Sequence, residues 1–152
     1  MFTAIFTAAF ICWGLSEVAI SLLFRTKTEP TKDAGTLKLV LIAAYSSLGV
    51  AVYLALADDG VFVRQSLAGV SGLAMILLGM AVRFWSIATL RRFFTVNVTL
   101  RDDHRLIRVG PYRLLRHPSY TGALLEFYGF ALAVENVWAA LIVVIPITYA
   151  FF

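Results

Sequence analysis

Long stretches without charged residues constrain this chain more than any other feature of its sequence. Met1 to Phe24 is broken only by Glu17, and Leu39 to Ala57 carries no charge at all. An α-helix rises about 1.5 Å per residue, so the first stretch is long enough to cross a hydrocarbon layer of about 30 Å. Two further apolar stretches follow, at about 66–90 and 121–152. The pattern predicts an all-α integral membrane protein.

The composition excludes other broad classes of protein. Of the 152 residues, 61% are hydrophobic and 14% are charged, which is too little charge to cover the surface of a water-soluble domain. Cys12 is the only cysteine, so a disulfide framework and a cysteine-based zinc site are ruled out, and we expect no metal. Because most of the chain belongs in lipid, the expected partner is the bilayer and not a nucleic acid.

The apolar stretches predict five transmembrane helices in a single domain covering 1–152. Their expected ranges are about 2–24, 38–57, 66–90, 121–134 and 137–152. The last two should form a helical hairpin, because 121–152 is too long for one upright helix and Glu135-Asn136 near its middle favours a tight polar turn. We expect the first helix to be retained, since it lacks the basic start and the short apolar core of a signal peptide.

The connections between the apolar stretches predict an orientation. The first, 25–38, holds four basic residues, and the second, 58–65, holds two aspartates against one arginine. The third, 91–120, holds seven arginines. The positive-inside rule then places the N-terminus outside and the third connection in the cytoplasm. Short loops and the lack of targeting signals favour a prokaryotic inner membrane.

The third connection has an order of residues that a simple linker does not need. Gly110-Pro111-Tyr112 predicts a turn that sets the direction of the tyrosine ring. In His117-Pro118 the proline moves His117 out of the helical region, which predicts a second turn. We expect the two turns to hold Tyr112, His117 and Tyr120 close together at the cytoplasmic mouth of the bundle. The alternative is that the arginines only fix topology and hold anionic lipid head groups, at about 1 kcal/mol each.

This connection and its flanks resemble a known family. The residues concerned are Arg83-Phe84-Trp85, Phe93-Phe94-Thr95, His104-Arg105-Leu106-Ile107, Gly110-Pro111-Tyr112 and Arg116-His117-Pro118-Ser119-Tyr120-Thr121-Gly122. In order and spacing they are similar to the isoprenylcysteine carboxyl methyltransferases, which stand beside the phospholipid methyltransferases among integral-membrane methyltransferases. The resemblance extends by motif over about 75–136. It implies that S-adenosylmethionine is the cofactor, bound at the cytoplasmic ends of the last helices in a cofactor segment between the third and fourth helices.

The resemblance also implies which residues contact that cofactor. Carried over by motif, they are Asn97, His104, Arg105, Leu106, Ile107, Tyr112, His117, Pro118, Ser119 and Tyr120. These residue types suit the ligand, because aromatic faces attract a sulfonium cation and a guanidinium pairs with a carboxylate. Neutral histidines are able to hydrogen-bond ribose or adenine. No residue is assigned as catalytic.

The favoured reaction is methyl transfer to a lipidic acceptor, with O-methylation of a prenylated-cysteine carboxylate or an analogue as the first choice. A terminal carboxylate has a pKa of about 3.5 and is already ionised at neutral pH, so positioning suffices. Phospholipid N-methylation is the alternative, and it needs a base such as His104 or a glutamate. An NADPH-dependent enzyme resembling sterol reductases and a non-catalytic membrane protein are two further interpretations of the same sequence.

Charges within the apolar stretches need partners, since each costs about 2.5–3.5 kcal/mol on insertion. Arg83 and Glu126 are candidates for substrate contact, through the mouth and the acceptor tunnel respectively. The favoured alternative is that Arg83 pairs with Glu126 as a tie between helices. Glu135 is expected at the hairpin turn on the far side. Close helix packing is expected at Gly69, Gly72 and Gly79.

Members of the family continue past the hairpin into a segment with an arginine, a pair of glutamates and an FG...Y..Y pattern, which completes the cofactor pocket. This sequence ends at Tyr149-Ala150-Phe151-Phe152, about where that segment begins. We therefore expect either further residues in the native protein or a protein without those groups. Reading the gene beyond Phe152 distinguishes the two.

Overall fold

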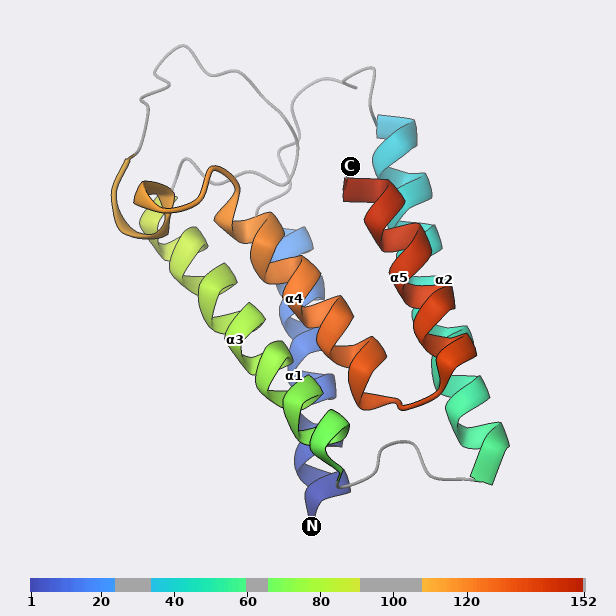
Figure 1. The fold of residues 1–152 in the computed structure, drawn as a ribbon. Helices are drawn as coiled ribbons and strands as arrows, with labels where there is room; N and C mark the ends of the chain where they lie inside the picture. The colour runs from blue at the N-terminus through green and yellow to red at the C-terminus, as the bar shows by residue number, and fades with distance from the viewer. Residues whose placement is uncertain (24–33, 60–65, 91–107, 152) are drawn as a thin grey trace.

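The computed structural model describes residues 1–23, 34–59, 66–90 and 108–151, and within these ranges every regular element is helical (Figure 1). The elements are α1 (Phe2–Leu23), α2 (Ala34–Asp59), α3 (Leu67–Leu90), the short 3-10 helix η2 (Gly110–Arg113), α4 (Pro118–Ala133) and α5 (Val137–Phe151). The all-α prediction is confirmed for this part of the chain.

Two of the described helices have the length and composition to cross a membrane. They are α1, over Phe2–Ile20, and α3, over Leu67–Leu90. The apolar parts of α2 and α5 are shorter. Large apolar side chains such as Leu22 and Ile145 lie exposed on the outside of the helices, as expected where lipid surrounds them. Five membrane spans remain a prediction.

Paired glycines bring α3 and α4 into close contact. A Cβ atom added to Gly79 would lie 2.6 Å from the carbonyl oxygen of Gly122, and one added to Gly129 would lie 2.6 Å from that of Gly72. Side chains at these positions would push the backbones apart, and small residues of this kind are typical of membrane helix pairs. The sequence predicted close packing for Gly72 and Gly79, and the structure supplies their partners on α4.

Aromatic side chains join α1 to α4. The rings of Phe10 and Phe130 stack with centroids 5.2 Å apart, and Trp13 meets Phe127 edge-on at 5.1 Å. Trp13 and Phe130 are buried in the core. Offset and edge-to-face pairs of this kind stabilise beyond the area that they bury. The first helix is therefore packed against α4, and it also contacts α3.

The connection from α4 to α5 is a short polar turn. Glu135 has a φ of 54°, in the left-handed region that few residues other than glycine adopt. The Asn136 side-chain oxygen accepts a hydrogen bond from the Ala139 amide at 3.0 Å, which caps the start of α5. The Ser66 hydroxyl donates to the Glu135 carboxylate, so the start of α3 is tied to this turn. From here α5 runs back beside α2 (Figure 1).

Candidate functional site

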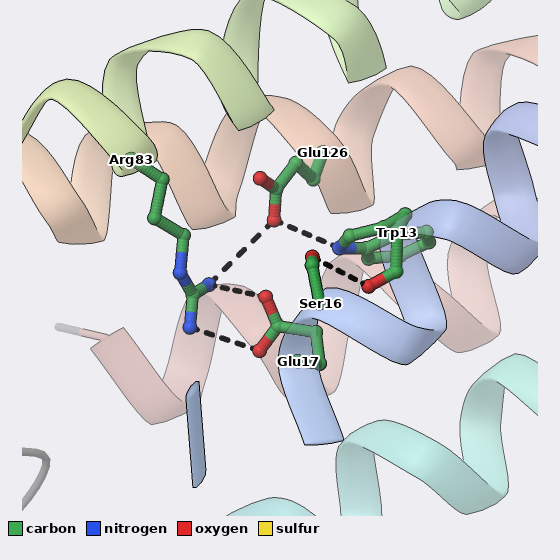
Figure 2. A network of polar contacts seen from close by, with 5 residues as sticks. All are labelled: Trp13, Ser16, Glu17, Arg83 and Glu126. Atoms are coloured by element: carbon green, nitrogen blue, oxygen red, sulfur yellow. Dashed lines mark hydrogen bonds and ion pairs between the residues drawn. The ribbon is translucent and has the colours of Figure 1, made fainter. Parts of the chain in front are cut away.

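Four side chains from α1, α3 and α4 form what we call the buried network: Trp13, Glu17, Arg83 and Glu126 (Figure 2). The Arg83 guanidinium binds Glu17 with both terminal nitrogens, Nη1 to Oε1 at 2.8 Å and Nη2 to Oε2 at 2.9 Å. The same Nη1 lies 3.6 Å from Glu126 Oε2, to which the Trp13 indole N–H donates at 2.8 Å. These contacts connect three helices in the interior of the bundle.

The network lies beside one of the close glycine contacts between α3 and α4. Gly79 and Gly122 remove side chains on either side of it, and a Cβ on Gly122 would lie 3.1 Å from the Cβ of Arg83. Glu126 is only 1% exposed, so its carboxyl group would be costly to bury without the Trp13 and Arg83 contacts. One oxygen of Glu126 and the Nε of Arg83 have no hydrogen-bond partner among the described residues. Arg83 and Glu126 thus hold helices together, and a substrate role for either stays a prediction.

The second group of interest is the mouth segment, 108–120, which lies beyond the end of α3 and leads into α4 (Figure 1). Gly110 has a φ of 58° and opens η2. A Cβ on Gly110 would lie 2.8 Å from the Thr89 hydroxyl and 3.3 Å from the Trp85 indole nitrogen. Both the backbone conformation and the close approach to α3 therefore require glycine here. Pro111 follows as the second residue of η2, within the first turn, where its missing N–H is no loss.

Tyr112 is the half-buried residue of the mouth segment. It lies against Ser86 of α3, which is fully buried. Burial raises the pKa of the Tyr112 phenol above its usual value, and the hydrogen bond with Ser86 lowers it by less. The phenol is therefore neutral at physiological pH.

His117 and Tyr120 are brought together at the start of α4. Pro118 is the first residue of that helix and His117 caps it with a φ of −130°, outside the helical region, as the proline predicted. The His117 carbonyl accepts from the Thr121 amide at 3.0 Å. The imidazole and the Tyr120 ring stack with centroids 5.7 Å apart and planes 20° from parallel. His117 is exposed and Tyr120 is 52% exposed, so the pair presents an aromatic face outward.

The structure divides the predicted cofactor residues into two sets. The described set lies on η2, at the N-cap of α4 and in the first turn of α4, with Pro118 buried and Ser119 partly buried: Tyr112, His117, Pro118, Ser119 and Tyr120. The other predicted contacts lie outside the described residues: Asn97, His104, Arg105, Leu106 and Ile107. The cofactor-binding roles of both sets remain predictions.

Sequence reasoning missed the contribution of α1. The sequence marked Glu17 only as a charge in need of a partner, and it did not single out Trp13. Residues four apart lie on one face of a helix, so Trp13 and Glu17 are neighbours on α1. That spacing, together with Arg83 and Glu126 in other apolar stretches, was the available signal for a shared contact.

The mouth segment has the chemistry that a cationic, partly aromatic ligand needs. A cation within about 6 Å of a tyrosine face is attracted by the ring quadrupole, and a planar heterocycle stacks on the same kind of face. Tyr120 offers such a face beside an imidazole, and Tyr112 offers a neutral hydroxyl. The residues present therefore fit S-adenosylmethionine.

Comparison with known proteins assigns the chain to a family. Residues 67–152, which include α3, η2, α4 and α5, match the phospholipid methyltransferase family. The chain belongs to that family. The matched range covers more than half of the sequence and contains both the mouth segment and two of the four residues of the buried network. Neither Trp13 nor Glu17 lies within it.

Individual proteins similar to this chain support its resemblance to the isoprenylcysteine carboxyl methyltransferases. A probable protein-S-isoprenylcysteine O-methyltransferase of Oryza sativa subsp. indica is 40% identical over 60 residues, 38% of this chain and 31% of the relative. Protein-S-isoprenylcysteine O-methyltransferase B of Arabidopsis thaliana is 42% identical over 60 residues, 38% of this chain and 30% of the relative. The match thus spans about a third of the length of these relatives. No solved structure matches the chain.

Proposed function

We propose that this protein is a membrane methyltransferase that uses S-adenosylmethionine and acts on a lipidic acceptor at the mouth segment. The observation that carries the proposal is the exposed stack of His117 and Tyr120 within the range that matches the family. Both rings are exposed at the start of α4, so the stack contributes little to the buried core. It is suited to binding a ligand.

Each described residue of the mouth segment has a proposed task. Tyr120 would hold the positive charge of the cofactor against its ring, and His117 would hydrogen-bond the nucleoside part. Tyr112 would contact the cofactor through its neutral phenol. S-adenosylmethionine, when bound, supplies a methyl group on a positively charged sulfur. Asn97, His104, Arg105, Leu106 and Ile107 are proposed to complete the shell.

The proposed acceptor is the carboxylate of a prenylated cysteine or an analogue. An ionised carboxylate attacks a methyl group without losing a proton, so the protein needs only to align the acceptor and exclude water. The buried network fits this view, because Glu17 and Glu126 are held by Arg83 and Trp13 in the interior of the bundle and are not part of the mouth segment. The relatives named as isoprenylcysteine methyltransferases support the same acceptor.

Phospholipid N-methylation is the second candidate, and the name of the matched family favours it. An ammonium head group must lose a proton before it accepts a methyl group. The base would be His104, which lies outside the described residues, or His117, the exposed imidazole of the described part of the mouth segment. This requirement makes the two candidates chemically distinguishable.

Methyl-labelled cofactor tests both candidates in one experiment. The full chain is reconstituted in vesicles and offered N-acetyl-farnesylcysteine or phosphatidylethanolamine. Label on a carboxylate is released as methanol by mild alkali because it is an ester, whereas label on nitrogen survives. We expect alkali-labile label on farnesylcysteine, lost in the His117→Ala variant. Transfer to neither acceptor would reject the proposal, and alkali-stable label would establish the second candidate.

The proposed membrane arrangement has five spans, with the N-terminus outside and the mouth segment in the cytoplasm of a prokaryotic cell. The excess of arginine in 91–120 over the acidic 58–65 supports it. A protease-cleavable tag before Met1 should be removed from intact spheroplasts. Protection of that tag until the membrane is opened would reverse the assignment.

A further inference from the structure

The mouth segment carries a second surface that the proposed methyl transfer does not use. Arg108, Arg113 and Arg116 are all exposed. Three apolar side chains are exposed between them, namely Val109 at 63%, Leu114 at 79% and Leu115 at 39%. We call these six residues the arginine collar. A water-facing turn has no reason to expose two adjacent leucines between arginines, whereas a segment at a lipid surface does.

The position of the collar in the fold matches a membrane surface. It follows the end of α3, which is long enough to cross the membrane, and it precedes Pro118, where α4 begins (Figure 1). A segment at this point lies at the level of the lipid head groups. Leucine side chains there are able to enter the acyl boundary while guanidinium groups stay among the head groups.

The charge of the collar has no counterpart among the residues that the structure describes. From Arg108 to Leu125 the sequence contains no aspartate or glutamate. Two acidic residues of the described bundle, Glu17 and Glu126, are bound within the buried network. Over the same described ranges, the ion pairs found belong to Arg83 and not to the collar. The collar is therefore suited to receive negative charge from another molecule.

We infer that the arginine collar is a binding surface for anionic phospholipids of the surrounding leaflet, separate from the cofactor site. Guanidinium groups pair with phosphate in bidentate fashion and favour it over a zwitterionic head group whose ammonium offsets the charge. The exposed leucines add the apolar contact that distinguishes a lipid from a free phosphate. The surface holds the mouth segment at the membrane, next to the place where a lipidic acceptor arrives.

Titration calorimetry on the full chain in a neutral detergent tests the inference. The probes are dihexanoyl-phosphatidylglycerol, dihexanoyl-phosphatidylcholine and glycerol 3-phosphate. We expect the anionic lipid to bind more tightly than the other two. About 1 kcal/mol per arginine at an anionic surface corresponds to about a fivefold change in affinity, so Arg113→Gln with Arg116→Gln should weaken binding by about 25-fold.

Controls separate this surface from unspecific charge and from the cofactor site. Arg64→Gln removes the same charge from the connection between α2 and α3 and should leave the affinity unchanged. Leu114→Ser should weaken the binding of the anionic lipid but not that of glycerol 3-phosphate. Equal binding of the two lipids, or wild-type affinity in the double variant, would overturn the inference. So would displacement of the lipid by saturating S-adenosylmethionine, because the arginines would then belong to the cofactor pocket.

Discussion

The buried network and the mouth segment both combine charged and aromatic side chains, but these side chains make different contacts. In the network, Arg83 binds Glu17 with two nitrogens and Trp13 donates to Glu126, so its charged groups face each other. In the mouth segment, His117 and the collar arginines are exposed. The charged residues in these two regions thus differ, since those of the network pair with each other in the interior and those of the mouth segment lie on the surface.

The difference separates stability from activity. A buried ion pair is strongly destabilising when one partner is removed, because the other remains charged and desolvated. An exposed side chain is replaced at little cost to stability. We therefore expect variants of the network to unfold the protein more readily and variants of the mouth segment to lose ligand binding while the fold persists.

Arg83→Met should have the largest effect on stability. It leaves Glu17 without its partner, and we expect the free energy of unfolding in detergent to fall by about 3–5 kcal/mol. Adding Glu17→Met should restore most of the loss, because two apolar side chains then replace the pair. A double variant as unstable as the single one would show that the two residues do not act as a pair. Chemical denaturation followed by circular dichroism measures the difference.

Gly79→Ala should have the next largest effect and lower the free energy of unfolding by about 2–3 kcal/mol. The new Cβ would meet the Gly122 carbonyl oxygen at 2.6 Å, so α3 and α4 would have to separate. Gly49→Ala is the matched control, because nothing lies within 4 Å of a Cβ at that position of α2. Its stability should be unchanged or slightly higher. Equal thermal midpoints for the two variants would contradict the close packing of α3 on α4.

Trp13→Phe should lower the free energy of unfolding by about 1–2 kcal/mol. Phenylalanine keeps most of the aromatic contact with Phe127 but removes the indole N–H that binds Glu126. The same chemical denaturation measures it. Combining Trp13→Phe with Glu126→Leu tests the contact, since the two effects should be less than additive if the hydrogen bond is the reason for the loss.

Tyr112 should give the smallest effect, and only at high pH. Burial raises the pKa of its phenol in the folded state, so the unfolded chain loses this proton at a lower pH than the folded one. The contribution of Tyr112 to stability is thus complete below about pH 10 and declines as the pH rises through the folded pKa. Tyr112→Phe should lack that part of the decline. Identical pH profiles of the unfolding midpoint would contradict a buried phenol.

The main features of the fold follow from the sequence because they depend on local rules. Uncharged stretches predicted the helices, and prolines at 111 and 118 predicted the turns of the mouth segment. The sequence placed the start of α4 near residue 121, whereas the helix begins at Pro118, because proline is well tolerated in a first turn. Glu135 lies at the α4–α5 turn, as its place among apolar residues predicted.

Other features depend on how helices are placed in space, which the order of residues does not state. Arg83 was expected to meet Glu126, and it does at 3.6 Å, but its closer partner is Glu17, on a helix 66 residues earlier. The sequence likewise did not predict that Gly122 and Gly129 of α4 pack against the glycines of α3. For the site, the sequence predicted that Tyr112, His117 and Tyr120 gather. The structure stacks His117 on Tyr120 and holds Tyr112 against Ser86 of α3.

The most direct test of the proposed separation compares one variant from each region in the same two measurements. S-adenosylmethionine affinity is measured by titration calorimetry, and stability by chemical denaturation, for the wild type, His117→Ala and Trp13→Phe. We predict that His117→Ala lowers the affinity for the cofactor at least about tenfold, equivalent to about 1.4 kcal/mol of binding free energy, and leaves stability unchanged. Trp13→Phe should lower stability and leave the affinity for the cofactor unchanged. If the wild type binds the cofactor and His117→Ala binds it with the same affinity, the account is contradicted.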